Sequence, residues 1–115
     1  MAVPPISGVS AARELRDRAQ AAAASGKHKA ALDLYLELER LAPADPIWPK
    51  RAGDVLRRLG KRGEAVRAFD RAAERYVRSG FAAQAAALYH LILQLEPAHA
   101  DARARLDAIE AHHRR

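Results

Sequence analysis

The sequence lacks several residues on which common folds and sites depend. Cysteine is absent, which excludes disulfides and thiolate metal ligands. Threonine is also absent and aromatic residues make up only 5%, so residues that favour β-strands are scarce. No apolar run reaches the roughly 18 residues of a membrane span, because Gln84, His90 and Gln94 interrupt the richest segment. The first residues show no basic segment followed by an apolar one, so we expect no secretory leader and a cytoplasmic location.

Alanine and arginine are the residues that the chain has in excess. It contains 28 alanines, and 16 arginines against 4 lysines. Alanine, leucine, arginine and glutamate are strong helix formers, so the composition predicts an all-α protein. The same bias is typical of a GC-rich bacterial genome. The net charge of +6 leaves two interpretations open: the arginines solvate the surface, or they attract an anionic partner.

A ladder of glycine, a small residue, an aromatic residue and an apolar residue occurs three times. Its members are Gly26, Ala31, Tyr35 and Leu38, then Gly60, Ala65, Phe69 and Ala72, then Gly80, Ala85, Tyr89 and Ile92. The first two copies are 34 residues apart and the last two are 20 apart. A glycine turn between helices that pack through small and aromatic residues is typical of a helix–turn–helix repeat.

The apolar periodicity predicts about six helices. The expected ranges are 10–24, 27–42, 46 or 49 to 59, 62–79, 81–95 and 98–111. We expect residues 1–9 to form a flexible tail, because Pro4, Pro5 and Gly8 disfavour regular structure, and residues 10–115 to form one helical domain. The last helix has a narrow apolar edge and a charged outer face, which suits a cap on an open stack.

This pattern resembles the tetratricopeptide repeat (TPR) family. The match is best over residues 46–77, where Ala52 and Gly53 stand at small positions of the first helix and Phe69 at the aromatic position of the second. The resemblance implies antiparallel helix hairpins in a right-handed α-solenoid that binds a partner rather than performing chemistry. The short third unit implies that the helix over residues 62–79 closes one repeat and opens the next.

In TPR arrays the first helices of successive repeats line a binding groove, so the resemblance implies groove residues here. With the neighbouring basic corner they are Arg16, Gln20, Lys50, Arg51, Asp54, Arg57 and Arg58. Paired cations at such positions could hold a carboxylate or an acidic peptide through charge-assisted hydrogen bonds. The clamp subtype of the family has asparagine where this chain has Asp17 and Asp54. The alternative is a solvated helix face.

Two other surfaces are candidates for partner binding. Leu32, Leu36 and Leu91 lie off the main apolar stripes, and an exposed patch there would bind a protein or a second copy of the chain, unless the terminal helices cover it. The cations of residues 50–67 could bind nucleic acid. We favour a protein partner, because few aromatic residues accompany these cations to stack bases and no recognition helix is visible.

Signatures of catalysis and metal binding are lacking in the sequence. The five histidines form no i, i+4 pair, and Gly60 to Gly63 lacks the spacing of a phosphate loop. We therefore expect no enzyme activity, no metal and no cofactor. The arginines at 67, 71, 75 and 78 are expected to pair on the surface with Asp70 and Glu74. The prediction is an adaptor or scaffold, for instance in a bacterial signalling, polarity or motility complex.

Overall fold

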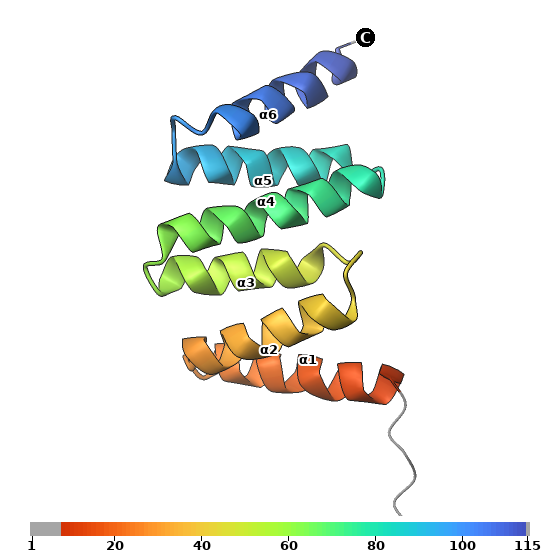
Figure 1. Ribbon diagram of the computed structural model, residues 1–115, viewed down its shortest axis with the longest axis vertical. Helices are drawn as coiled ribbons and strands as arrows, with labels where there is room; N and C mark the ends of the chain where they lie inside the picture. The colour runs from red at the N-terminus through yellow and green to blue at the C-terminus, as the bar shows by residue number, and fades with distance from the viewer. Residues whose placement is uncertain (1–7, 115) are drawn as a thin grey trace, which may run out of the picture.

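Six α-helices and no β-strand make up residues 8–114, the part of the chain that the computed structural model describes (Figure 1). They are α1 (Gly8–Ala24), α2 (His28–Leu41), α3 (Ile47–Arg58), α4 (Arg62–Arg78), α5 (Ala82–Leu95) and α6 (Ala100–His113). The all-α prediction is confirmed, and the helix ends lie within two residues of the expected ones. None of these helices is both long enough and apolar enough to cross a membrane.

The start of α1 corrects one prediction. The helix begins at Gly8, so residues 8 and 9 are helical rather than part of a flexible tail. The first N–H groups of a helix have no intrahelical partner, so the helix penalty of glycine applies only weakly at this position. The rest of the expected tail, residues 1–7, lies outside the described residues.

The three ladder glycines close three turns of the same geometry. Gly26, Gly60 and Gly80 have φ angles of 74°, 78° and 83°, in the left-handed region that glycine adopts without strain. The amide that follows each glycine donates back across the turn, as Lys61 N–H does to the Leu56 carbonyl at 2.9 Å. These bonds satisfy carbonyls left open at the helix ends and reverse the chain direction.

The core consists of small residues packed against aromatic rings. Ala31, Ala65 and Ala85 are fully buried, and the rings of Phe69 and Tyr89 are fully buried with them. Helices α3 and α4 approach each other closely, because a Cβ added at Gly53 would lie 2.6 Å from the Phe69 ring. The small positions therefore let helix backbones approach around each ring.

Each helix packs mainly on its neighbours in the chain, so the array is an open stack of 62 × 31 × 18 Å (Figure 1). Helix α4 packs extensively on both α3 and α5, as its expected double role requires. Helix α6 packs on α5 through Ala102 and Leu106, both fully buried. Its outer face is exposed, as expected of a cap.

Three residues that helix periodicity places on the apolar stripes of their helices are nevertheless exposed. Ala30 is exposed in the first turn of α2, and Leu41 and Val77, at the ends of α2 and α4, are 54% and 47% exposed. Helix periodicity placed these residues on the correct stripe, but helix ends extend past the neighbouring helices that would cover them.

Candidate functional site

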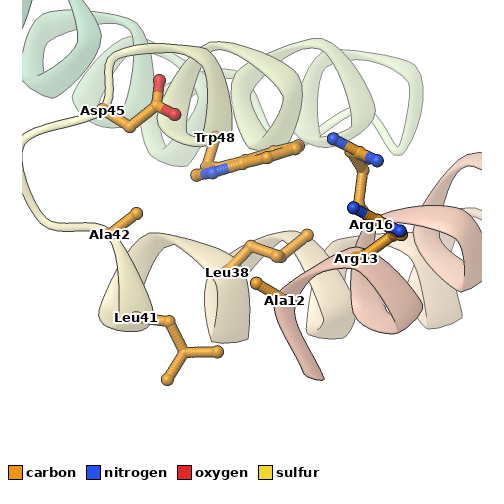
Figure 2. Close-up of a pocket in the computed structure, with 8 residues that line it drawn as sticks. All are labelled: Ala12, Arg13, Arg16, Leu38, Leu41, Ala42, Asp45 and Trp48. Atoms are coloured by element: carbon orange, nitrogen blue, oxygen red, sulfur yellow. The ribbon is translucent and has the colours of Figure 1, made fainter. Parts of the chain in front are cut away.

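Helices α1 and α3 both pack on α2, and two hollows lie between them, one after the other along both helices. We call these hollows together the α1–α3 groove. The first has a volume of about 500 Å³ and is lined by Ala12, Arg13, Arg16, Leu38, Leu41, Ala42, Asp45 and Trp48 (Figure 2). The second has a volume of about 420 Å³ and is lined by Ala23, Ala24, His28, Tyr35, Arg51, Asp54, Val55 and Arg58.

The floor of the groove is aromatic. The Trp48 and Tyr35 rings stack with a centroid distance of 6.3 Å and an interplanar angle of 21°. Trp48 lies in the first turn of α3, where the Asp45 carboxylate accepts the Ile47 N–H at 3.0 Å and fixes the helix start. The indole therefore reaches from α3 across to Leu38 of α2 (Figure 2).

Two arginines of α1 stand beside this floor. Arg16 points into the first hollow with its guanidinium next to the end of the indole, and Arg13 lies beside it (Figure 2). The nearest carboxylate to Arg16 is that of Asp17, at 3.9 Å, which leaves most of its donors available. Two cations beside an apolar floor attract an anionic group that also carries an apolar side chain.

The second hollow combines two cations with an imidazole. Arg51 and Arg58 are exposed on α3 and lie on either side of Asp54, which pairs with Arg57 at 3.7 Å. Across from them, the Nδ1 atom of His28 is buried and has no hydrogen-bond partner within the described residues. A ligand that entered this hollow could supply the missing partner.

No family model and no curated protein matches the sequence. Solved structures do match. The type III secretion translocator chaperone SycD of Yersinia enterocolitica is 19% identical, with 96% of this chain and 90% of that chain covered and a TM-score of 0.53. The second TPR domain of human RPAP3, in complex with an HSP70 peptide, is 20% identical. The match covers 90% of this chain and 98% of that chain, with a TM-score of 0.51. The OM64 TPR domain of Arabidopsis is 18% identical, with 92% of this chain and 99% of that chain covered and a TM-score of 0.50.

The chain folds as a short TPR-like array. The resemblance seen in the sequence is thereby confirmed at the level of fold. SycD has also been solved with a peptide of the translocator YopD, at 19% identity over 87% of this chain and 92% of that chain and a TM-score of 0.51.

The groove of the TPR-like array contains four of the seven residues named for it. Arg16, Arg51, Asp54 and Arg58 line the two hollows, whereas Gln20, Lys50 and Arg57 line neither. Arg13, His28 and Trp48 also line the groove and were not named for it from the sequence. Arg13 was detectable, because it lies three residues before Arg16 and therefore on the same helix face.

The three leucines of the expected apolar patch do not form one surface. Leu36 is 37% exposed and Leu32 is half-buried on α2. Leu91 is half-buried against the core on α5, and α3 and α4 separate α2 from α5 in the stack (Figure 1). Only Leu32 and Leu36 lie together, so the patch is confined to α2.

Two arginines of α4 correct another prediction, whereas Arg78 pairs with Glu74 at 3.9 Å as expected. Arg71 and Arg75 do not pair with Asp70 and Glu74 but with Glu39 of α2, which is 9% exposed. Arg71 donates to both Glu39 oxygens at 2.8 and 3.0 Å, and Arg75 donates to one at 2.8 Å and to the Asp45 carbonyl at 2.9 Å. Burial alone would raise the pKa of Glu39, but the hydrogen bond and charge of Arg71, together with Arg75, outweigh burial and lower it.

A second polar cluster lies where α4, α5 and α6 approach one another. The Oδ1 atom of Asp70 and the hydroxyl of Tyr89 are buried without a hydrogen-bond partner among the described residues. Burial raises the pKa of Asp70, and the nearby carboxylate of Glu74 adds to the shift. Glu74 in turn pairs with Arg105 of α6 at 3.6 Å, so this cluster connects the cap to the rest of the array.

Proposed function

We propose that the chain is a protein-binding adaptor whose α1–α3 groove holds an extended acidic segment of a partner protein. The observation that carries this proposal is the stacked floor of Trp48 and Tyr35 between cations at both ends of the groove. Aromatic rings supply contact area for an apolar side chain. The guanidinium groups of Arg16 and Arg58 supply charge-assisted hydrogen bonds to carboxylates on either side of it.

The structural neighbours support this mode of use. RPAP3 and SycD have been solved with a bound peptide of another protein, and this chain shares their fold. At these identities a shared fold supports peptide binding in general and not a particular partner. Support for an acidic ligand with an apolar anchor therefore comes from the groove residues of this chain rather than from the comparison.

Trp48 makes the proposal directly testable, because it is the single tryptophan of the chain and lies in the groove. The probe is a synthetic decapeptide with one leucine, four glutamates and an amidated end. Titration should change the Trp48 fluorescence to saturation. The same peptide with lysine for glutamate should leave it unchanged.

Variants locate the binding. The double substitution Arg13→Ala with Arg16→Ala should lower the affinity for the decapeptide by about tenfold or more, as expected for the loss of anchoring contacts. Arg103→Ala with Arg114→Ala removes two exposed arginines of the α6 region and changes the net charge equally, so it serves as the control. Equal weakening in both variants, or no saturable signal, would overturn the proposal.

The nucleic-acid alternative is less well supported by the same geometry. Arg57 and Lys61 already pair with Asp54 and Glu64 at 3.7 and 3.8 Å, and Arg62 donates to the Leu95 carbonyl at 3.4 Å. Fewer cations of residues 50–67 are thus available for phosphates. If nucleic acid were the ligand, affinity for a labelled 20-base DNA would fall by roughly a thousandfold or more between 50 and 200 mM salt.

The finer proposal places the adaptor in a bacterial cytoplasmic complex of signalling, polarity or motility proteins. It is supported by the alanine- and arginine-rich composition and by the repeat architecture. Affinity capture with nuclease, comparing the wild type with the Arg13→Ala, Arg16→Ala variant, would identify the partner as the protein that only the wild type retains.

A further inference from the structure

A second concave surface lies along α2 and α4. It consists of two adjoining hollows of about 430 and 210 Å³, which share Leu36 and Arg71 as lining residues. We call it the α2–α4 furrow. Leu36 is about 100° from Tyr35 and 160° from Leu38 around α2, so the furrow and the α1–α3 groove lie on different sides of this helix. From Leu32 to Arg40 the furrow follows α2 for ~12 Å, about two helical turns, and Pro43 lines its end beyond the helix.

Arg71 is held in place at the centre of the furrow. Its Nε and Nη2 atoms donate to the buried Glu39 carboxylate, which Arg75 also contacts. A guanidinium has five N–H donors, so three of the Arg71 donors are not used in this pair. One carboxylate between two guanidiniums leaves a net positive charge, and the Arg71 side chain is 41% exposed. The furrow therefore offers a preoriented cation to an incoming carboxylate.

The apolar part of the furrow lies beside this cation. Leu36 is 37% exposed where the two hollows join, and Leu32 and the buried Leu56 extend the apolar surface along the smaller hollow. A single exposed leucine is ordinary on a protein surface. Here the leucine borders two hollows and a fixed guanidinium. This combination fits a helix that presents an apolar side chain and a carboxylate one turn apart.

We propose that the α2–α4 furrow docks an acidic amphipathic helix of a partner protein, separate from the segment in the groove. Charge complementarity identifies the occupant. Arg67 and Glu64 both line the smaller hollow. Glu64 pairs with Lys61 at 3.8 Å, whereas Arg67 has no carboxylate within 4.0 Å among residues 8–114, so Arg67 adds to the positive rim. A second copy of the chain is a poorer occupant, because each copy has a net charge of +6 and two copies repel each other.

The test uses a fluorescein-labelled 14-residue helical peptide with leucines along one stripe and glutamates on both flanks, followed by fluorescence anisotropy. Leu36→Glu should weaken its binding by at least about tenfold. Val77→Glu is the matched control, because Val77 is 47% exposed on α4, lines none of the hollows described above, and introduces the same charge. It should change binding by less than about twofold. A peptide with serine for leucine should not bind.

The Arg67→Glu variant is a second test, which leaves the apolar surface unchanged because Arg67 lies on the exposed rim. It should weaken the binding of the helical peptide as Leu36→Glu does. In both variants the Trp48 response to the acidic decapeptide should persist, because the groove is untouched. Circular dichroism at 222 nm should match the wild type.

Three results would each overturn the inference. Equal effects of Leu36→Glu and Val77→Glu would show that net charge alone attracts the peptide. If the decapeptide displaced the helical peptide, or if the Arg13→Ala, Arg16→Ala variant no longer bound the helical peptide, the helical peptide would bind in the groove instead. Sedimentation that shows a dimer in the wild type and a monomer in Leu36→Glu would assign the furrow to a second copy of the chain.

Discussion

At the residue scale, two positions set how neighbouring helices meet. Gly53 lets the α3 backbone approach the buried Phe69 ring, where no Cβ fits without displacement. Glu39 joins α2 to α4 by receiving hydrogen bonds from Arg71 and Arg75 in a nearly buried position. Gly53 thus sets how closely α3 and α4 pack within one hairpin, and Glu39 holds α2 of one hairpin against α4 of the next.

Gly53→Ala should destabilise the protein. The new methyl group would lie 2.6 Å from a fully buried ring, and overpacking of this kind costs about 1–3 kcal/mol. The better helix propensity of alanine returns only about 0.5–1 kcal/mol. Urea unfolding should show a lower midpoint. Gly63→Ala is the control, because only Arg67 Nη1 comes near, at 3.8 Å; an equal drop there would contradict the steric explanation.

Glu39→Gln should lower the free energy of unfolding by about 2–3 kcal/mol at pH 7, because two guanidiniums lose a largely buried charge partner and Arg71 is partly screened by solvent. The lowered pKa of Glu39 means that its contribution is present above the ordinary value of 4.5 and is lost as the pH falls through the folded-state pKa. The difference from the wild type should therefore shrink on acidification.

Glu64→Gln provides the comparison for this change. Glu64 is exposed and pairs with Lys61 at 3.8 Å, so its substitution should alter stability by less than about 0.5 kcal/mol. Urea titrations at several pH values measure both variants. A Glu39→Gln deficit that stays constant down to pH 3 would show that shape rather than charge matters at this position.

At the element scale, α4 and α6 depart from a simple series of hairpins. Helix α4 packs on α3 and on α5, so it belongs to two hairpins at once. Helix α6 has only α5 as an extensive neighbour and covers it with Ala102 and Leu106. A terminal helix that contacts one neighbour can detach without unfolding the remaining stack.

Leu106→Ala should loosen α6 selectively. Leu106 is fully buried, and such truncations cost about 2–5 kcal/mol when the whole domain must absorb them. In this protein the cost cannot exceed the free energy with which α6 docks on α5, because α6 can detach while α1 to α4 stay folded. Hydrogen exchange should accelerate in α6 and at the α5 surface beneath it, while α3 keeps its protection. Uniform acceleration across all helices would show that the array unfolds as one unit.

At the scale of the whole molecule, the open stack carries the groove and the furrow along its length. The radius of gyration is 16.1 Å, whereas a compact domain of this length has about 13 Å. An elongated array exposes more surface than a sphere, and the groove and the furrow use different sides of α2. If both proposals hold, the molecule would bring together two acidic segments that do not contact each other, as an adaptor does.

This arrangement predicts that both sites can be filled at once. With the helical peptide saturating the furrow, the affinity of the decapeptide for the groove, measured by Trp48 fluorescence, should change by less than about twofold. The reciprocal titration should agree, because binding linkage is symmetric. Competition between the peptides would mean that the two surfaces act as one site.

The parts of the fold that depend on local chemistry could be predicted from the amino-acid sequence alone. The turn glycines, the small and aromatic ladder and the helix-forming composition predicted the hairpins, because each signal lies within one or two helical turns of the structure it specifies. The first groove candidates also followed from one helix face at a time. Arg16 and Arg58 were found in this way, and both line the groove.

Which distant residues meet depends on how the helices pack against one another, and the sequence does not show it. Arg71 and Arg75 follow Glu39 by 32 and 36 residues, and the periodicity of α4 alone made them appear as solvated arginines. Arg13 and Trp48 likewise come from different helices to line one hollow. A helical pattern shows which face of a helix is apolar but not which helix will cover it. Crossing geometry and helix ends, which exposed Leu41 and Val77, are properties of packing between segments rather than of either segment.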